Sequence, residues 1–169
     1  MIDLYSPEIE AEAEAKALEK FAARFNCCQS VLASLAEYTF EIDANGLEKL
    51  KKRATGFGGG IGGQGRECGV LIALVTALGE KTGTTTPKKP RKPTGDLVKE
   101  SYKMFRREYG HALCKDLCSC DLSTEEGMKE AHENVCPKYV STAVRIFFSL
   151  MRSYSNPQGR EKNYTQNQK

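Results

Sequence analysis

A run of glycines in the middle of the chain limits what this sequence can fold into more than any other feature does. Seven of the ten residues from 56 to 65 are glycine, which is too many for the interior of a helix or a strand. Apolar residues recur at helical spacing on both sides of the run. The run therefore predicts a tight glycine-rich turn between two packed helices.

The N-terminal half reads as helices separated by short turns. Ser6 and Pro7 suit the cap and the first position of a first helix, and Asn26 is typical of the cap of a second. A turn region over residues 39–45 precedes a third helix, and a strongly apolar helix follows the glycine run over about residues 67–78. No segment shows the alternation of a half-buried strand, so we expect an all-α fold.

The C-terminal half continues the helical pattern. Residues 84–95 are basic and proline-rich, and they are expected to form a solvated surface loop. Gly110 ends the helix that follows this loop. Ser123 begins a capping box that predicts another helix, and Cys136-Pro137 begins a long last helix.

Length and composition fit one globular domain. The chain has 169 residues, of which 40% are hydrophobic and 28% are charged, as in ordinary soluble proteins. We expect a single bundle of about six to seven helices over residues 1–155, followed by a disordered polar tail over 156–169. The net charge of +3 is too small to indicate a nucleic-acid or membrane partner.

Seven cysteines are the unusual part of the composition. The N-terminus lacks the basic and apolar regions of a secretory signal, and no stretch is long and apolar enough to cross a membrane. We therefore expect a cytoplasmic protein, in which most thiols are reduced. An odd number of cysteines also cannot pair completely within one chain. Metal, cluster or redox chemistry explains these thiols better than structural disulfide bonds do.

Several passages around cysteine and glycine form a pattern when they are taken together. They are Phe25-Asn26-Cys27, the stretch from Ala54 to Gly62, Glu67-Cys68-Gly69, Cys114 before a helix, and Cys136 before Pro137. The pattern resembles one bacterial and archaeal family, the C_GCAxxG_C_C proteins, which are regarded as redox-active. The resemblance extends over roughly residues 15–152 and implies an all-helical domain with four characteristic cysteines. Val70 and Ala73 stand where the family has smaller residues.

The resemblance selects four of the seven thiols, Cys27, Cys68, Cys114 and Cys136, as the functional centre. Each of them lies at or near the start of a predicted helix, where free backbone N–H groups and the positive end of the helix dipole favour thiolate over thiol. A thiolate is both the redox nucleophile and the metal ligand. The four cysteines are therefore the candidate catalytic residues and the candidate metal ligands.

Two kinds of redox chemistry fit four thiolates. They can cycle between dithiol and disulfide, or they can hold an iron–sulfur cluster for electron transfer, for which four thiolates are the usual ligands. Glycines allow a backbone loop to approach a cluster and turn N–H groups toward sulfur. Gly58, Gly59, Gly60 and Gly62 are therefore the candidate cofactor-binding residues. Either chemistry implies a redox partner protein or oxidoreductase.

Two other kinds of site were weighed against these. The glycine run matches the dinucleotide fingerprint G-x-G-x-x-G, but that motif should follow a strand, so nucleotide binding is not expected. Zinc is an alternative cofactor, and it would make the protein a zinc-stabilised, cysteine-rich binding module without redox activity. The candidate zinc ligands are His111, Cys114, Cys118 and Cys120, together with His132 and Cys136.

The sequence also supports predictions for the three other cysteines, for Glu67 and for the oligomeric state. Cys28 faces the apolar side of its helix and is expected to be a buried residue, whereas Cys118 and Cys120 could resolve a disulfide or form a reactive accessory pair. Glu67 is expected to be a solvated glutamate at a helix start. The apolar helices around residues 70–78 and 140–150 carry enough surface for a homodimer, although a buried core explains them equally well.

Overall fold

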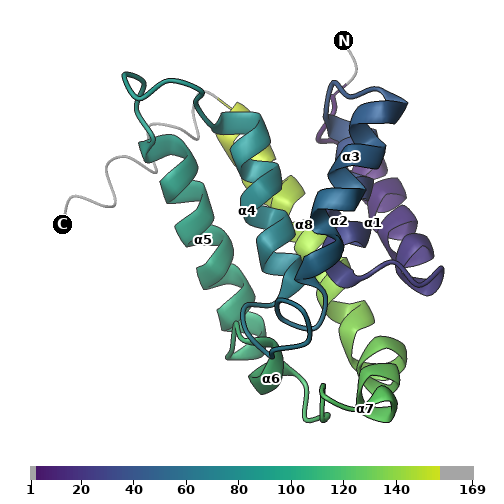
Figure 1. The fold of residues 1–169 in the computed structure, drawn as a ribbon. Coiled ribbons are helices and arrows are strands. Elements are labelled where there is room, and N and C mark those ends of the chain that lie inside the picture. Colours follow the sequence, from purple (N-terminus) through teal and green to yellow (C-terminus); the bar gives the residue numbers. More distant parts are fainter. Residues whose placement is uncertain (1–2, 157–169) are drawn as a thin grey trace.

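The computed structural model describes residues 3–156 as a bundle of helices (Figure 1). The elements in chain order are α1 (Pro7–Ala22), α2 (Cys27–Thr39), α3 (Ala44–Ala54), the 3₁₀ turn η1 (Thr55–Phe57), α4 (Gly69–Thr82), α5 (Lys92–Tyr109), α6 (Cys114–Leu117), α7 (Glu125–Glu130), the π-helical turn η2 (Ala131–Val135) and α8 (Cys136–Ser155). The described residues include no strand beyond one isolated bridge between Glu67 and Leu113. The all-α prediction is confirmed.

The predicted helix number agrees with the long helices of the described region. Helices α1 to α5 and α8 are the long ones, and α6 and α7 have only four and six residues. The loop after α4 is shorter than the sequence indicated, because α5 already begins at Lys92. The tail predicted for residues 156–169 lies outside the described residues, apart from Asn156.

Side-chain caps explain where the first helices begin. The Ser6 hydroxyl accepts the Ile9 N–H at 3.3 Å, and Asn26 forms a reciprocal capping box with Gln29. Such caps each stabilise a helix by about 1 kcal/mol. The cap of α7 differs from the prediction, since Thr124 rather than Ser123 accepts the Gly127 N–H.

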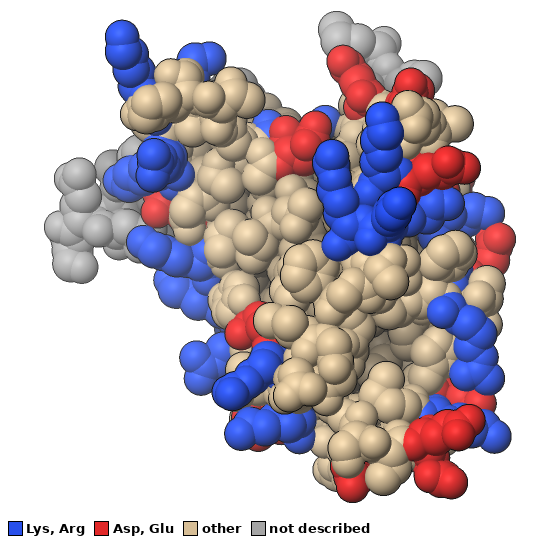
Figure 2. Space-filling view, viewed as in Figure 1, with Lys and Arg blue, Asp and Glu red and all other residues tan. Residues whose placement is uncertain are grey.

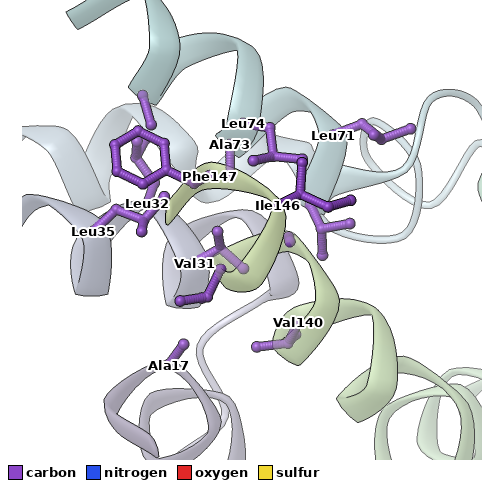
Figure 3. Close-up of a cluster of buried hydrophobic side chains, with 14 of the residues drawn as sticks. Ala17, Val31, Leu32, Leu35, Leu71, Ala73, Leu74, Val140, Ile146 and Phe147 are labelled. Carbon is purple, nitrogen blue, oxygen red and sulfur yellow. The ribbon is translucent and has the colours of Figure 1, made fainter. Parts of the chain in front are cut away.

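Helix α8 lies at the centre of the bundle, where it packs against α1, α2, α4 and α5. The core that these helices share contains Phe105, Phe147 and Phe148, all with no exposed surface. Figure 3 shows how side chains of α2, α4 and α8 converge around Phe147. Burying each large apolar side chain contributes about 1.5–3 kcal/mol, so this core supplies most of the stability. The apolar surface of the helices around residues 70–78 and 140–150 is largely used in it.

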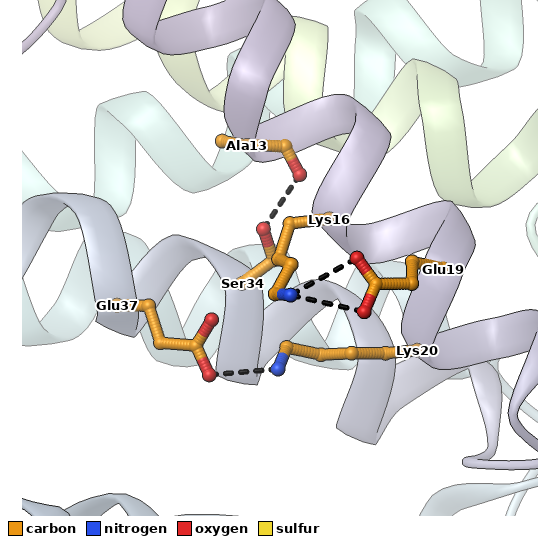
Figure 4. A network of polar contacts seen from close by, with 6 residues as sticks. All are labelled: Ala13, Lys16, Glu19, Lys20, Ser34 and Glu37. Carbon is orange, nitrogen blue, oxygen red and sulfur yellow. Dashed lines mark hydrogen bonds and ion pairs between the residues drawn. The ribbon is translucent and has the colours of Figure 1, made fainter.

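Polar contacts determine how α1 sits on α2 (Figure 4). The buried Ser34 hydroxyl donates to the Ala13 carbonyl at 2.6 Å, which removes an otherwise unpaired hydroxyl from the interface. Nearer the surface, the Lys20 ammonium lies 2.7 Å from the Glu37 carboxylate. These contacts hold the C-terminal half of α2 against α1.

Charged side chains gather at the margins of the face drawn in Figure 2. Lys and Arg residues lie over α3 and along α5, and an uncharged surface covers the middle, over α4 and the glycine run. Within residues 3–156, no helix combines the length and the apolar character that a membrane span requires.

Candidate functional site

A cavity of about 70 Å³ lies where the first residues of several helices meet, and all four predicted cysteines line it. We call it the cysteine cavity, and we call Cys27, Cys68, Cys114 and Cys136 the tetrad. A water-sized group needs about 10–15 Å³ of such space, so the cavity has room for several. The other lining residues are Phe21, Asn26, Gly58, Gly59, Leu117, Cys118, Leu122, Met128, Ala131, His132 and Tyr139.

The tetrad residues occupy the helix starts that the sequence predicted. Cys27, Cys114 and Cys136 are the first residues of α2, α6 and α8, and Cys68 directly precedes α4. All four are free thiols. Cys27, Cys68 and Cys114 are buried, and Cys136 is half-buried.

Electrostatic interactions connect every pair within the tetrad. The charge of Cys114 raises the pKa of Cys27, and the charges of Cys27, Cys114 and Cys136 all raise the pKa of Cys68. Cys27 and Cys114 in turn raise the pKa of Cys136. These relations include all six pairs, so the four sulfurs lie near enough to influence one another around the cavity.

The protonation state of the tetrad differs from the prediction. Burial, more than any other cause, raises the pKa of Cys27 to about 11, although the backbone N–H groups of Cys28, Cys27 and Gly69 act in the opposite direction. Burial also raises the pKa of Cys68 and Cys114, and that of Cys136 to about 12. The helix-start N–H groups were predicted to favour thiolates, but desolvation outweighs them. At neutral pH the tetrad is therefore made of thiols.

Cys136 shows why a helix start in the sequence need not offer free N–H groups. The chain reaches Cys136 through α7 and the π-helical turn η2, and the Cys136 N–H already donates to the Ala131 carbonyl. Pro137 lacks an N–H, and its ring crowds the preceding turn. A widened π turn accommodates such a proline within continuous helix. The positive end of the helix dipole therefore does not lie at Cys136.

Glycines of the predicted loop make room for two tetrad members. A Cβ on Gly69 would lie 2.6 Å from Cys27 Sγ, and a Cβ on Gly60 would lie 2.6 Å from Cys114 Cβ. Both distances are too short for any side chain, so only glycine lets these cysteines approach the backbone. Of the four predicted cofactor-binding glycines, Gly58 and Gly59 line the cavity, Gly60 packs behind Cys114, and Gly62 has open space around its Cα.

The glycine loop also holds α6 in position. Backbone hydrogen bonds run from Cys114 N–H to the Arg66 carbonyl at 2.7 Å and from Lys115 N–H to the Gly65 carbonyl at 3.1 Å. The Cys68 N–H donates to the Ala112 carbonyl at 3.0 Å. This pairing joins the segments that carry Cys68 and Cys114, and it explains how a helix of only four residues is kept against the cavity.

Comparison with known proteins places the chain in a family. A family model described as "Putative redox-active protein (C_GCAxxG_C_C)" matches residues 25–150, a range that contains the whole tetrad and the glycine loop. The chain belongs to the C_GCAxxG_C_C family. An uncharacterized protein of Archaeoglobus fulgidus is 30% identical over 153 residues, which cover 85% of this chain and 96% of that protein. No solved structure matches.

Val70 and Ala73, the two residues expected at small positions of the family pattern, are both fully buried in the core. They follow Gly69 on α4 and lie among the residues of the apolar core cluster. Neither residue lines the cysteine cavity.

The three cysteines outside the family pattern have different surroundings. Cys28 is fully buried in the apolar core, as predicted, and does not line the cavity. Cys118 and Cys120 form a disulfide bond, with a Cα–Cα distance of 5.1 Å. Cys118 also lines the cysteine cavity. The short Cys-x-Cys spacing indicated that Cys118 and Cys120 could form a bond with each other. It did not indicate that this bond lies beside the tetrad.

His132 is a cavity residue that the sequence indicated only as a zinc ligand. Its ring stacks on Phe21 at a centroid distance of 4.0 Å, and its Nε2 atom is buried without a hydrogen-bond partner among the described residues. Burial and the nearby Arg24 charge lower the pKa of His132, although a hydrogen bond to the Phe21 backbone opposes them. A neutral imidazole with an unoccupied nitrogen therefore borders the tetrad.

The described part of the chain contains no set of side chains arranged as ligands for zinc. Within residues 3–156, no three or more His, Cys, Asp or Glu side chains form a group that could hold a metal ion. His111 is exposed and does not line the cavity. Cys118 and Cys120, two of the proposed ligands, are joined to each other.

Glu67 is not the solvated glutamate that the sequence suggested. It is half-buried, and its Oε1 atom is buried without a hydrogen-bond partner in the described region. Burial first, and then a hydrogen bond to Glu67, raise the pKa of Tyr102. Glu67 thus belongs to the packing between the glycine loop and α5.

Proposed function

We propose that this protein is a thiol redox protein whose tetrad cycles between two thiols and one disulfide. The observation that supports the proposal is the convergence of all four family cysteines on one cavity, with every pair of sulfurs in electrostatic contact. Buried thiols scattered through a core would have no such arrangement. A redox partner protein or oxidoreductase would supply the opposing disulfide or dithiol.

The exchange follows ordinary thiol–disulfide chemistry. One tetrad thiol loses its proton and attacks a disulfide of the partner, which forms a mixed disulfide and releases one partner thiolate. A second tetrad thiol then attacks the first tetrad sulfur, closes a disulfide within the tetrad and releases the other partner thiolate. In total, two electrons and two protons pass from the tetrad to the partner.

His132 is suited to accept the first proton. Burial keeps the tetrad thiols protonated at neutral pH, so the attack requires a base beside them. The His132 imidazole lines the same cavity, and its Nε2 atom has no hydrogen-bond partner among the described residues. We propose that this nitrogen takes up the thiol proton as the sulfur attacks.

Disulfide mapping tests the proposal. The fully reduced protein would be oxidised with glutathione disulfide under anaerobic conditions, unfolded in urea with N-ethylmaleimide and digested with trypsin. Each tetrad cysteine then lies on its own peptide, since the cleavage products are residues 25–49, 67–81, 108–115 and 130–138. We expect a covalent link between two of these four peptides, and its loss when the protein is reduced again.

Cys28→Ala is the matched control, because Cys28 neighbours Cys27 in the sequence but does not line the cavity. It also leaves Cys27 as the only thiol of peptide 25–49. This variant should form the same link as the natural protein. If all four tetrad thiols stay reduced while glutathione disulfide is consumed elsewhere, the dithiol/disulfide proposal is wrong.

An iron–sulfur cluster held by the tetrad is a second candidate, and it would require the four sulfurs to move, because no three of these side chains are grouped as a metal site in the described part of the chain. In each of the six pairs, the negative charge of one thiolate destabilises the other thiolate. The positive charge of bound iron would reverse that electrostatic effect. Four thiolates are the usual ligands of such a cluster, and Gly58 and Gly59 leave the cavity wall beside them without side chains. When bound, the cluster would supply one-electron transfer.

Anaerobic reconstitution separates the two candidates. The reduced protein would be incubated with ferrous iron and sulfide, passed through a desalting column, and assayed for iron, sulfide and visible absorption. A cluster predicts that the natural protein and Cys28→Ala retain iron and sulfide together, and that Cys68→Ser loses most of both. Equal iron contents in all three proteins would instead indicate adventitious binding.

A further inference from the structure

The Cys118–Cys120 disulfide lies beside the tetrad although neither cysteine belongs to the family pattern. Cys118 lines the cysteine cavity and is only 2% exposed. It follows Cys114 by one helical turn, and its N–H donates to the Cys114 carbonyl at 3.0 Å. Five cysteines therefore border one cavity, four as thiols and one as half of a disulfide.

A structural role explains this disulfide poorly. It joins residues only two positions apart in the sequence, and the stabilisation that a disulfide gives by restricting the unfolded chain is smallest for the shortest loops. The surrounding turn already has its own hydrogen bonds, such as that from the Cys120 N–H to Cys118 Sγ at 3.3 Å. The position of the bond is therefore more informative than its contribution to stability.

The two ends of the bond differ in access. Cys118 lies in the cavity wall, whereas Cys120 is half-buried and follows the exposed Ser119. Cys120 is thus more accessible to a thiol or disulfide from solution than the buried members of the tetrad are. The disulfide connects that accessible position to the cavity.

We propose that Cys118 and Cys120 form a second redox couple that exchanges electrons with the tetrad through Cys114. This inference rests on the dithiol/disulfide function proposed above. It assigns a role to two residues outside the family pattern, and it gives the buried tetrad a route to disulfides and thiols in solution.

The exchange balances within the chain. The Cys114 thiolate attacks Cys118 Sγ, a Cys114–Cys118 bond forms, and Cys120 leaves as a thiolate that takes up a proton. A second tetrad thiolate then attacks Cys114 Sγ, closes a disulfide within the tetrad and releases Cys118, which also takes up a proton. Two tetrad thiols have lost two electrons and two protons, and Cys118 and Cys120 have gained them.

Trypsin separates the partners of the first step, because Lys115 lies between Cys114 and Cys118. The full chain would be reduced, oxidised with limiting glutathione disulfide, sampled over time and alkylated in urea. We expect the Cys118–Cys120 bond to appear first, within peptide 116–129. A transient link between peptides 108–115 and 116–129 should follow, and then the link within the tetrad.

Cys120→Ser removes the second couple and keeps the tetrad. It should slow formation of the tetrad disulfide at least tenfold, whereas Ser119→Ala, which changes the exposed residue between the two cysteines, should not. A circular dichroism spectrum would show whether each variant folds. The time course of the natural protein decides the inference even if Cys120→Ser does not fold.

The outcomes separate the inference from the proposed function. If the tetrad disulfide forms without the link between peptides 108–115 and 116–129, and equally fast in a folded Cys120→Ser variant, the second couple is not used and only this inference is overturned. If no tetrad disulfide forms in any protein, although Cys118 and Cys120 do become linked, the proposed function itself fails.

Discussion

The apolar core and the cysteine cavity are both buried and share Phe21, Cys27, Cys68 and Tyr139, yet their other residues differ in kind. Phe105, Phe147 and Phe148 fill the core with large side chains that have no exposed surface. The cavity combines sulfur atoms with glycines, of which Gly59 has a positive φ, and keeps about 70 Å³ unfilled.

The difference shows where the molecule gives up stability. Its buried thiols have raised pKa values, and the His132 Nε2 atom has no hydrogen-bond partner among the described residues. The unpaired nitrogen is unfavourable for folding, and the buried thiols become unfavourable when they ionise, whereas the side chains of Phe105, Phe147 and Phe148 carry no polar or ionisable group. Unfavourable features gathered in one place are typical of a functional site.

The largest expected effect lies in the core. Phe147→Ala should lower the free energy of unfolding by about 3–5 kcal/mol, because it removes a fully buried ring and leaves a cavity. The ring also contacts those of Tyr5 and Phe148. Urea denaturation would measure the change, with Val75→Ala on the exposed side of α4 as the control, expected within about 0.5 kcal/mol. A loss below 1 kcal/mol for Phe147→Ala would show that the core does not dominate stability.

Alkaline pH should destabilise the protein through its buried thiols, of which Cys27 lines the cavity. The folded pKa of Cys27 is raised from 9.0 to about 11, so the unfolded chain releases its proton first as the pH rises. Stability from this group is complete below pH 9 and is lost as the pH rises through about 11. The loss amounts to about 3 kcal/mol.

Urea denaturation of the reduced protein from pH 8 to pH 11 would measure this loss, with Cys27→Ala as the comparison. The natural protein should lose more stability over this range than the variant does. Parallel curves for the two proteins would contradict the assignment of a strongly raised pKa to Cys27.

Two glycines of α4 should respond to alanine in opposite directions. Gly69→Ala places a Cβ 2.6 Å from Cys27 Sγ and 2.8 Å from the Phe57 carbonyl oxygen, so we expect a loss of about 1–3 kcal/mol. Gly79→Ala meets nothing within 4 Å and should gain about 0.5–1 kcal/mol from its helix propensity. Thermal unfolding of both variants would measure the two changes in stability. If Gly69→Ala stabilised the protein, Cys27 would not lie as close to α4 as the structure shows.

The last comparison lies within the glycine loop, between its outer side and the side that faces Cys114. Gly62 has a φ of 61° but open space around its Cα, so Gly62→Ala should cost about 1–2 kcal/mol from backbone strain alone. Gly60→Ala adds contacts of 2.5 Å and 2.6 Å with the Arg66 backbone and should cost clearly more. Equal losses in urea denaturation would show that the loop moves to accept the Gly60 side chain.

Much of the local structure was predictable from the residues. Ser6, Asn26 and Gly110 cap helices as predicted, and the tetrad lies at helix starts. The protonation state of the tetrad was not predictable, because it depends on burial by side chains that are distant in the sequence. The π turn before Cys136 was also missed, since Pro137 is compatible with both a new helix and a widened turn in a continuous one.

The sequence by itself determined the helices, the glycine turn between them and the presence of reactive residue types. These features depend on local physics: side-chain capping, helical periodicity and the backbone freedom of glycine. They place each cysteine on an element, but they set no distance between the elements.

Only the tertiary structure decided that the four helix starts meet. Cys27, Cys68, Cys114 and Cys136 come together because α8 packs along the other helices and the glycine loop binds the segment of Cys114. The same packing brings Cys118 and His132 to the cavity. Burial against these partners overrides the helix-start effect on the thiols, because desolvation acts on the whole surroundings of a sulfur, while the N–H groups act only from one side.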